Sequence, residues 1–447
     1  MHFSEPYKTD YLFYQTRSEL PFIDRAEGVY LYDHTGKKYL DGCSGAINTN
    51  IGHGNPRILQ AIAEQARKVF FSYRTQFENE PAHRLAAKLV HGSAEHLTKV
   101  FYVSSGSEAI ESAMKLARQY YFNRGQKSRY QFISRTPSYH GSTLGALSLT
   151  SSAQLELPFR PMLKSYPKIP SPYCFRCPYN KRYPSCNLAC AWELETTILE
   201  QGPDSIIGFM VEPIGGASTG ALVPPDDYFD VIQHICKKYD ILLILDEVMT
   251  GMGRTGAMYA YEHWNIKADI IALSKGLTSG YFPVGAILTT DEIVDDMMEK
   301  GGFAHGHTLA GNPMGCAVAL EVYNVIEDEG LVENSAKMGK LLIQGLNKLA
   351  KRYSIIGQVR GKGLLTAIEI VKPGTKKDIF PPEMDVNHLI ADWAFKDGLI
   401  LYPRRPINGL RGDHILIAPP LISDKAVIEE LLELLDKTLA RSMFMLG

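Results

Sequence analysis

The sequence has no long hydrophobic run and no excess of charge of either sign, and each absence excludes a class of protein. No segment reaches the roughly 18 consecutive apolar residues that a membrane-spanning helix needs. The 47 basic and 49 acidic side chains leave a formal net charge of −2, which gives no electrostatic reason to expect a nucleic acid or an anionic membrane as partner. The N-terminal stretch lacks a basic segment followed by an apolar run, so we expect no secretory signal peptide.

Cysteine is also scarce, and its pattern argues against a disulfide-stapled fold. The seven cysteines are an odd number, and only four of them cluster, which favours a reducing cytoplasm. The 447 residues are 45% hydrophobic and 21% charged, the usual mixture for a globular protein of two or three domains. A chain of this length can bury a large core without disulfides or metals.

The middle of the chain alternates short apolar runs with segments of helical spacing. This alternation is typical of strands joined by crossover helices, and it predicts a mostly parallel sheet within a large α/β domain at residues 55–320. The helical segments include SEAIESAMKLARQYYF and YFDVIQHICKKY. The apolar runs are FYVSSG, YQFISR, SIIGFMVEP, DILLILDE, ADIIALSK and FPVGAILT.

The two ends of the chain follow a different pattern. GQVRGKGLLTAIEIV indicates a strand pair between helical segments, so residues 321–447 are predicted to form a smaller α+β domain. Residues 1–54 are predicted to be an N-terminal arm that joins this smaller domain. Within the arm, GVYLYDHTGKKYLD indicates a hairpin that turns at His34-Thr35-Gly36.

Two of the apolar runs end in residues that can carry chemistry. Asp246 closes ILLIL, and Lys275 closes DIIALS. Open parallel sheets bind ligands beyond the carboxyl ends of their strands, which places both side chains where a pocket is expected. A pyridine cofactor needs a carboxylate to keep its ring nitrogen protonated and a lysine to form an imine. Either residue alone is more simply explained as a strand cap or a solvated lysine.

Further elements strengthen this interpretation. Ser104, Ser105, Gly106 and Ser107 lie between a strand and a helix, where hydroxyls and free N–H groups can hold a phosphate, although a simple serine N-cap gives the same pattern. In PSYHGSTLGALS, Tyr139 is placed to stack on a ring, and Gly141 allows close approach of the backbone. A packed loop aromatic is the alternative explanation for Tyr139.

Taken together, these motifs resemble the class III pyridoxal-phosphate aminotransferases, the ω-aminotransferase group of the type I fold. The resemblance extends over nearly the whole chain, and the spacing of 29 positions from Asp246 to Lys275 matches the family. It implies a mostly parallel, seven-stranded-type sheet flanked by helices, with a smaller α+β domain. The matching segments are YLDGCSGAINTNIGHGNP, SSGSEAIESAMKLAR, SYHGSTLGALS, VEPIGG, LILDEVMTGMGRTG, ALSKGL, HGHTLAGNP and ILIAPPL.

The resemblance also implies a role for each matching residue. Lys275 would form the imine with pyridoxal 5′-phosphate and shuttle the proton, and Asp246 would pair with the pyridine nitrogen. Thr308 would reach the phosphate of a neighbouring subunit, which implies a homodimer, or a tetramer, with shared active sites. The remaining cofactor-binding positions would be Gly106 and Ser107 at the phosphate, Tyr139 and Val248 on the two ring faces, His140 beside Tyr139, and Glu212 near the ring hydroxyl.

Substrate recognition is expected to involve an arginine, because at least the oxo-acid substrate is anionic. The candidates are Arg74 and Arg411, with Arg404 and Arg405 as possible substitutes. Relatives that favour bulky aromatic amines often carry an aromatic residue in place of Ile47, which we therefore expect to face the substrate.

A second departure from relatives concerns the segment after VEPIGG. Relatives that act on ornithine or γ-aminobutyrate carry a glutamate there as the resting partner of a mobile arginine, whereas Gly216-Ala217-Ser218 offers none. Together with Arg74, this difference favours a small ω-amino acid with an anionic far end, such as taurine or β-alanine. Pyruvate or 2-oxoglutarate would be the acceptor.

Two other sequence patterns are compatible with a metal site or a dinucleotide-binding site. Cys174, Cys177, Cys186 and Cys190 have the spacing C-x2-C-x8-C-x3-C, which suits either a structural zinc or iron–sulfur site or a loop of free thiols. GMGRTG at residues 251–256 fits a dinucleotide-binding pattern. However, it begins several residues after the strand, and no long helical pattern opens from it, so we interpret it as a loop.

Two alternative functions remain open at the level of the sequence. An amino-acid racemase or an aminomutase of the same fold would keep the same lysine and aspartate. A non-enzymatic cofactor-binding protein is disfavoured because the catalytic positions are complete and no DNA-binding module is appended.

Overall fold

The computed structural model describes residues 13, 20–405 and 412–446. Its largest sheet has seven strands in the order β4-β10-β9-β8-β7-β5-β6. Strand β10 runs antiparallel to both neighbours, whereas β9, β8, β7, β5 and β6 pair in parallel. All six predicted apolar runs supply strands of this sheet, so the mostly parallel sheet is confirmed. The strands are β4 Lys99–Val103, β5 Gln131–Thr136, β6 Lys168–Pro170, β7 Ile206–Val211, β8 Leu242–Asp246, β9 Ile270–Leu273 and β10 Gly285–Thr289.

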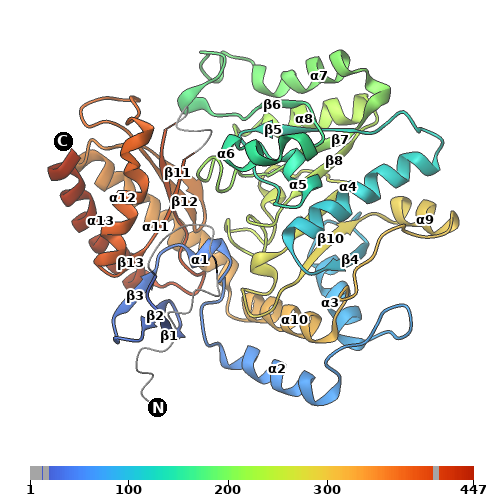
Figure 1. The fold of residues 1–447 in the computed structure, drawn as a ribbon, viewed down its shortest axis with the longest axis horizontal. Coiled ribbons are helices and arrows are strands. Elements are labelled where there is room, and N and C mark those ends of the chain that lie inside the picture. The colour runs from blue at the N-terminus through green and yellow to red at the C-terminus, as the bar shows by residue number, and fades with distance from the viewer. Residues whose placement is uncertain (1–12, 14–19, 406–411, 447) are drawn as a thin grey trace.

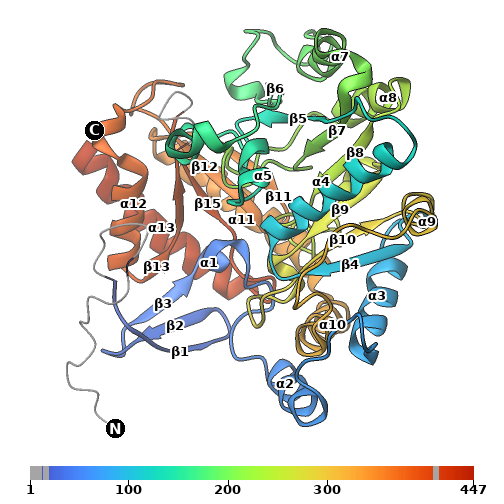
Figure 2. The same ribbon diagram turned by 45° about the vertical axis from the view of Figure 1, so that its right-hand side comes forward.

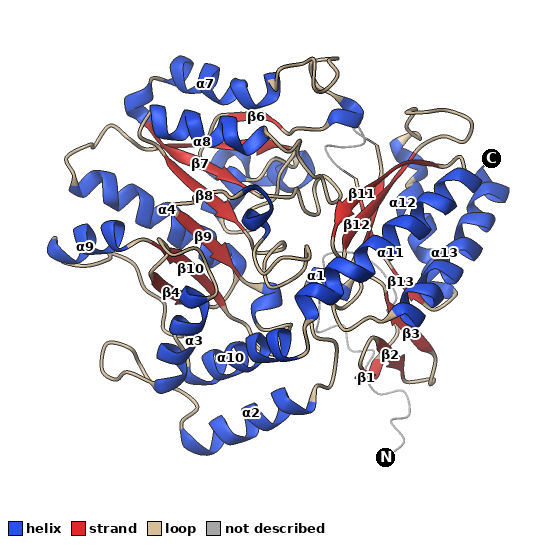
Figure 3. Cartoon of the chain, turned by 180° about the vertical axis from the view of Figure 1, so that it is seen from behind, coloured by secondary structure: helices blue, strands red, loops and turns tan. Residues whose placement is uncertain are grey.

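The central strands are apolar throughout because helices cover both faces of the sheet (Figure 3). In β8, Leu243 and Leu245 join the buried cluster that includes residues of α8, whereas Leu242 and Ile244 join the cluster that includes residues of α4. Alternate side chains of one strand thus supply two separate cores. The helices of this part are α2 Pro56–Lys68, α3 Glu80–His91, α4 Gly106–Asn123, α5 Leu144–Leu149, α6 Ala153–Glu156, α7 Ala189–Gln201, α8 Tyr228–Lys238, α9 Asp291–Glu299 and α10 Pro313–Asp328.

A second, antiparallel sheet lies beside the first with the C-terminal helices around it (Figures 1 and 2). Its order is β11-β12-β15-β14, and β11 and β12 are the strand pair that the sequence predicts. Its strands are β11 Ile356–Lys362, β12 Leu365–Ile370, β14 Tyr402–Arg404 and β15 His414–Ile417. Its helices are α11 Leu331–Arg352, α12 Val386–Lys396 and α13 Lys425–Leu446.

The N-terminal segment forms the predicted hairpin and a third sheet. Strands β1 (Ile23–Glu27), β2 (Tyr30–Asp33) and β3 (Lys38–Asp41) pair in sequence, and β3 then pairs in parallel with β13 (Leu399–Ile400). Helix α1 (Ser44–Ile47) follows and leads back to the large sheet. The arm therefore connects to the C-terminal part, as expected, while the domain limits at residues 54 and 320 stay predictions.

One buried arginine forms hydrogen bonds to both the N-terminal and the C-terminal segments. Arg254 is fully buried, and its guanidinium donates to the carbonyls of Ala418 and Pro419 and to the side chains of Ser44 and Asn50. This arginine lies in the GMGRTG segment, and its donors are used in packing, which agrees with our interpretation of the segment as a structural loop. No helix in the described part of the chain is long and apolar enough to cross a membrane.

Candidate active site

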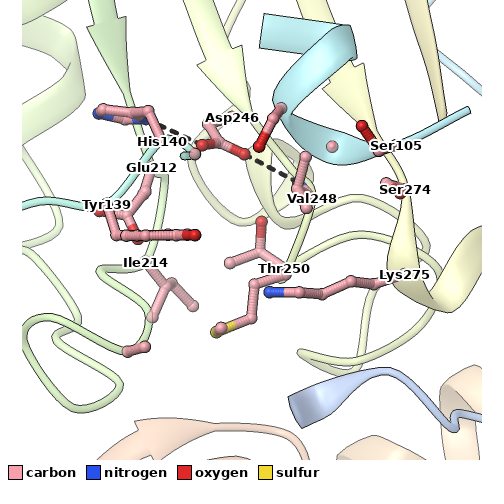
Figure 4. A pocket seen from close by; sticks show the side chains of 15 residues that line it. Ser105, Tyr139, His140, Glu212, Ile214, Asp246, Val248, Thr250, Ser274 and Lys275 are labelled. Atoms are coloured by element: carbon pink, nitrogen blue, oxygen red, sulfur yellow. Dashed lines mark hydrogen bonds and ion pairs between the residues drawn. The ribbon is translucent and has the colours of Figure 1, made fainter. Parts of the chain in front are cut away.

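Asp246 and Lys275 come together at the carboxyl ends of two adjacent strands. Asp246 is the last residue of β8 and lies opposite Ala272 of β9, and Lys275 follows the end of β9 by two residues. Both residues line one cavity of about 170 Å³, into which the Lys275 side chain extends (Figure 4). The convergence predicted from the sequence is therefore present in the structure.

The backbone at Lys275 has an unusual conformation. Its φ angle is 45°, in the left-handed region that side-chain-bearing residues seldom adopt and that recurs at functional sites. Burial lowers the pKa of the Lys275 amine, and the nearby carboxylates of Asp246 and Glu212 oppose this effect. An amine with a lowered pKa is more often neutral near pH 7, and only the neutral form is nucleophilic or basic.

The Asp246 carboxylate is held at both oxygens (Figure 4). Oδ2 lies 2.8 Å from His140 Nδ1, and Oδ1 accepts a hydrogen bond of 3.1 Å from the Val248 N–H. The backbone N–H of His140 donates to Thr150 Oγ1 at 2.9 Å. Asp246 is only 5% exposed, so these contacts fix the direction in which the carboxylate faces the cavity.

The first turn of helix α4 lines another part of the cavity. Ser105 caps the helix by accepting from the Glu108 N–H, and Gly106 and Ser107 follow in the cavity wall. A Cβ on Gly106 would come within 2.9 Å of Val248 Cγ1, so a larger residue would displace Val248. A helix N-terminus carries free N–H groups and partial positive charge, which together suit an anion such as a phosphate.

Two side chains that line the cavity each have one polar atom without a hydrogen-bond partner in the described part of the chain. The Glu212 side chain is buried, and its Oε1 accepts from the Gly216 N–H at 2.8 Å. Neither Glu212 Oε2 nor His140 Nε2 has a hydrogen-bond partner among the residues described. Burial also raises the pKa of Glu212. Since buried polar groups in folded proteins are nearly always paired, the unpartnered oxygen of Glu212 marks where a polar group of a ligand fits.

The structure thus gathers most of the predicted site residues in one place. Tyr139 also lines the cavity, its hydroxyl 3.0 Å from Ser142 Oγ. The predicted residues that line the cavity are Gly106, Ser107, Tyr139, His140, Glu212, Asp246, Val248 and Lys275. Sequence reasoning missed five further lining residues that lie within or just after the same motifs, namely Ile214, Ala217, Met249, Thr250 and Ser274.

Three predicted residues that the structure describes do not line the cavity. Ile47 is 1% exposed and packs in the core, so it does not line the cavity of one chain, and its contact with a substrate stays a prediction. Thr308 and Arg74 are both exposed, and the Arg74 side chain packs against Gly311. Arg411 lies outside the described residues.

The four clustered cysteines surround a second, smaller cavity of about 20 Å³. All of them are free thiols. Burial and the neighbouring thiols Cys174, Cys186 and Cys177 raise the pKa of Cys190 to about 12. Among the residues that the structure describes, no group of three or more His, Cys, Asp or Glu side chains is placed to hold a metal ion.

A buried histidine behind the cavity predicts a pH-dependent stability. Burial, and next the Arg360 cation, lower the pKa of His414 from 6.5 to about 3. Between these two pKa values the unfolded state protonates His414 whereas the folded state keeps it neutral. The contribution of His414 to the free energy of unfolding is therefore complete above pH 6.5 and is lost as the pH falls toward 3. At roughly 1.4 kcal/mol per pH unit, about 3 kcal/mol disappears between pH 6.5 and 4.5.

We expect His414→Gln to unfold in urea with a shallower pH dependence than wild type over this interval. His263 and His305, whose pKa values burial lowers to about 4, contribute equally in both proteins. Parallel curves for wild type and variant would contradict the assignment to His414.

The chain is similar to known proteins in both sequence and fold. A family model described as aminotransferase class-III matches residues 13–439. An uncharacterized aminotransferase of Bacillus subtilis, YodT, is 42% identical over 425 residues, which cover 95% of this chain and 96% of that protein. An adenosylmethionine-8-amino-7-oxononanoate aminotransferase of Methanocaldococcus jannaschii is 38% identical, with 91% and 90% covered. Gamma aminobutyrate transaminase 2 of Solanum lycopersicum is 35% identical, with 93% and 91% covered.

The fold agrees with solved structures of the same kind. An amine transaminase from an uncultivated Pseudomonas species, solved in its PLP-bound form, superposes with a TM-score of 0.90 at 32% identity. The superposition covers 98% of this chain and 99% of that one. The seven-stranded sheet and its helices are therefore those of a pyridoxal-phosphate-dependent transaminase.

Proposed function

Because this chain belongs to the class III aminotransferase family, we propose that it moves the amino group of a small ω-amino acid to a 2-oxo acid. Taurine or β-alanine would be the donor, and pyruvate or 2-oxoglutarate the acceptor. The enzyme is an aminotransferase that depends on pyridoxal phosphate. The observation that carries the assignment of roles is that Lys275 and Asp246 line one cavity.

The residues of the cavity fit this cofactor. Pyridoxal phosphate supplies an aldehyde for the amino group and a protonated pyridine that withdraws electrons. Gly106 and Ser107, in the first turn of α4, would hold the phosphate. The unpartnered Oε2 of Glu212 is suited to the ring hydroxyl. Tyr139 and Val248 would hold the faces of the ring, and His140 would position the carboxylate of Asp246.

The catalytic roles follow from how the two central side chains are held. His140 and the Val248 N–H fix the Asp246 carboxylate, which would pair with the protonated pyridine nitrogen when the cofactor is bound. Burial lowers the pKa of the Lys275 amine, which favours its role as the group that would bind the cofactor. Lys275 Nζ would act as the general base that accepts the proton from the donor carbon and passes it on. The same amine serves both halves of a ping-pong reaction.

A second copy of the chain is proposed to complete the site. A run of exposed apolar side chains precedes α3, and Arg74 in that run packs against Gly311, close to Thr308. Large exposed apolar patches mark interfaces, so a homodimer would bury this region and bring Thr308 toward the phosphate of the partner. The exposed side chains are Phe70, Phe71, Tyr73, Phe77 and, beside Thr308, Leu309. The free cysteines favour a reducing compartment, and we place the enzyme in the cytoplasm.

The anion of the substrate is proposed to bind at Arg404. Its guanidinium stacks on Tyr402 at 3.9 Å from the ring centroid, and its charge contributes to lowering the pKa of Lys275. Arg405, in contrast, is already paired with Asp413 at 2.6 Å. Arg404 is therefore the better candidate within one chain, and Arg74 would act only across a dimer interface.

A half-reaction screen tests this proposal. Purified holoenzyme is mixed with taurine, β-alanine, γ-aminobutyrate or neutral 1-aminopropane while its visible absorption is followed. We expect the anionic donors to bleach the absorption band. Arg404→Ala should lower kcat/KM for them by about 10- to 100-fold, the scale of a lost charged hydrogen bond, while the neutral amine changes little.

Arg74→Ala, measured in parallel, separates a contribution from the partner subunit. A holoenzyme that bleaches with none of the ω-amino acids would end the substrate proposal. Equal losses for charged and neutral donors would remove Arg404 as the site of anion binding.

A further inference from the structure

The loop at residues 216–220, between β7 and α8, forms one wall of the cavity through Ala217. Three of its carbonyl oxygens accept hydrogen bonds from outside the loop. Ala217 O lies 2.8 Å from His414 Nε2, Thr219 O accepts from Arg360 Nη2 at 2.9 Å, and Gly220 O accepts from Arg360 Nε at 2.6 Å. We propose that Arg360 and His414 are positioning residues that set the donor specificity of the enzyme by holding this loop.

Arg360 is itself fixed. It lies on β11, is 7% exposed, and donates through Nη1 to Glu369 Oε2 on β12 at 2.7 Å. Glu369 is fully buried and is also contacted by the Tyr173 hydroxyl and by Arg176 Nε. Charge-assisted hydrogen bonds in a buried network are strong and directional. The Arg360 guanidinium therefore cannot follow the loop if the loop moves.

The loop also packs closely against both anchors. Gly220 has φ +63°, and a Cβ there would lie 2.5 Å from His414 Cδ2 and 2.9 Å from Arg360 Nη2. At the other end, a Cβ on Gly216 would lie 2.7 Å from Met249 Sδ and 2.9 Å from Glu212 Oε1. Neither end of the loop leaves room for one added carbon. Because Gly216 packs against Glu212 and Met249, which line the cavity, a shift of the loop would displace these two side chains.

The composition of the loop explains why outside anchors matter. Its sequence is Gly-Ala-Ser-Thr-Gly, with no large side chain to shape the wall, so the path of the backbone determines the space beside Ala217. The anchors belong to β11 and β15 in the second sheet, whereas the loop follows a strand of the first sheet. Donor specificity would then depend on contacts between the two sheets. This inference rests on the proposed binding of the donor in this cavity.

Arg360→Lys tests the first anchor. Lysine keeps the charge but cannot donate to Glu369, Thr219 and Gly220 at once. We expect KM for β-alanine to rise by about 10-fold or more while kcat changes by less than about 3-fold, and the preference between β-alanine and γ-aminobutyrate to shift. The conservative His414→Gln, which can still donate to Ala217, should recover most of the selectivity that His414→Leu loses. Arg352→Lys, at an exposed pair with Asp436, is the matched control and should change neither value.

A binding measurement separates this inference from the proposed function. 3-Hydroxypropionate has the shape of β-alanine without its amine, and its Kd for the holoenzyme can be measured by calorimetry whether or not β-alanine reacts. We expect a rise of about 10-fold in Arg360→Lys and in His414→Leu. If no ω-amino acid reacts with wild type, the substrate proposal fails, but the positioning role of Arg360 and His414 is not affected. An unchanged Kd and unchanged selectivity in both variants, or losses that only follow the thermal midpoint, would overturn the positioning role.

Discussion

Lys275→Ala should lower kcat for transamination by about 10³-fold or more, because in the proposed function one side chain would supply both the amine that binds the cofactor and the base that moves the proton. The substitution removes a buried amine whose charge is disfavoured by desolvation, so the fold should be retained. Steady-state kinetics with the best donor from the half-reaction screen gives the rate. The visible spectrum should show cofactor that is bound without a covalent link to the protein.

Two comparisons make this expectation specific. Lys267→Ala removes an exposed lysine just before β9 and should leave kcat unchanged. Added methylamine should restore part of the rate of Lys275→Ala, since a small amine can enter the space of the missing side chain and accept the proton. A variant that keeps a tenth of the wild-type rate without added amine would show that another residue moves the proton.

The large sheet could be predicted from the sequence because its strands are buried on both faces. Strand β7 consists of six non-polar residues, and four apolar residues precede Asp246 in β8. Neither strand therefore alternates polar with apolar residues, and a helical segment separates the two. Strand β6, with only three residues, carries too short a signal to be recognised. Asp246 and Lys275 were predictable for the same reason as the strands, since each follows the end of a buried run.

The rest of the site depends on contacts that local sequence does not record. Ile47 follows a recognisable motif, but the packing of α1 against the core buries its side chain. Arg74 and Thr308 are exposed in one chain, and only an assembly can decide whether they reach a cavity. Arg360 and His414 lie 140 or more residues from the loop that they hold, in strands whose own patterns indicate only β-structure. Tertiary packing, rather than any motif, brings them behind Ala217.

Asp246→Asn should lower kcat by about 10²-fold or more while the fold and cofactor binding are retained. Asparagine keeps the size of the side chain and can still contact His140 and the Val248 N–H, but its neutral amide cannot hold a proton on the pyridine nitrogen, and preorganised charge of this kind is a large term in catalysis. Stopped-flow spectroscopy of the donor half-reaction measures the loss at the proton-transfer step.

The matched control is Asp269→Asn, at the opposite end of β9, where Oδ2 accepts from the Leu243 N–H at 2.7 Å. That half-buried carboxylate, whose pKa burial raises to about 6, supports the fold but lies outside the cavity wall, so its loss should reduce stability and leave the half-reaction within about 3-fold of wild type. If both variants lost rate equally, the effect of Asp246 would be one of general stability, and its pairing with the pyridine nitrogen would have to be abandoned.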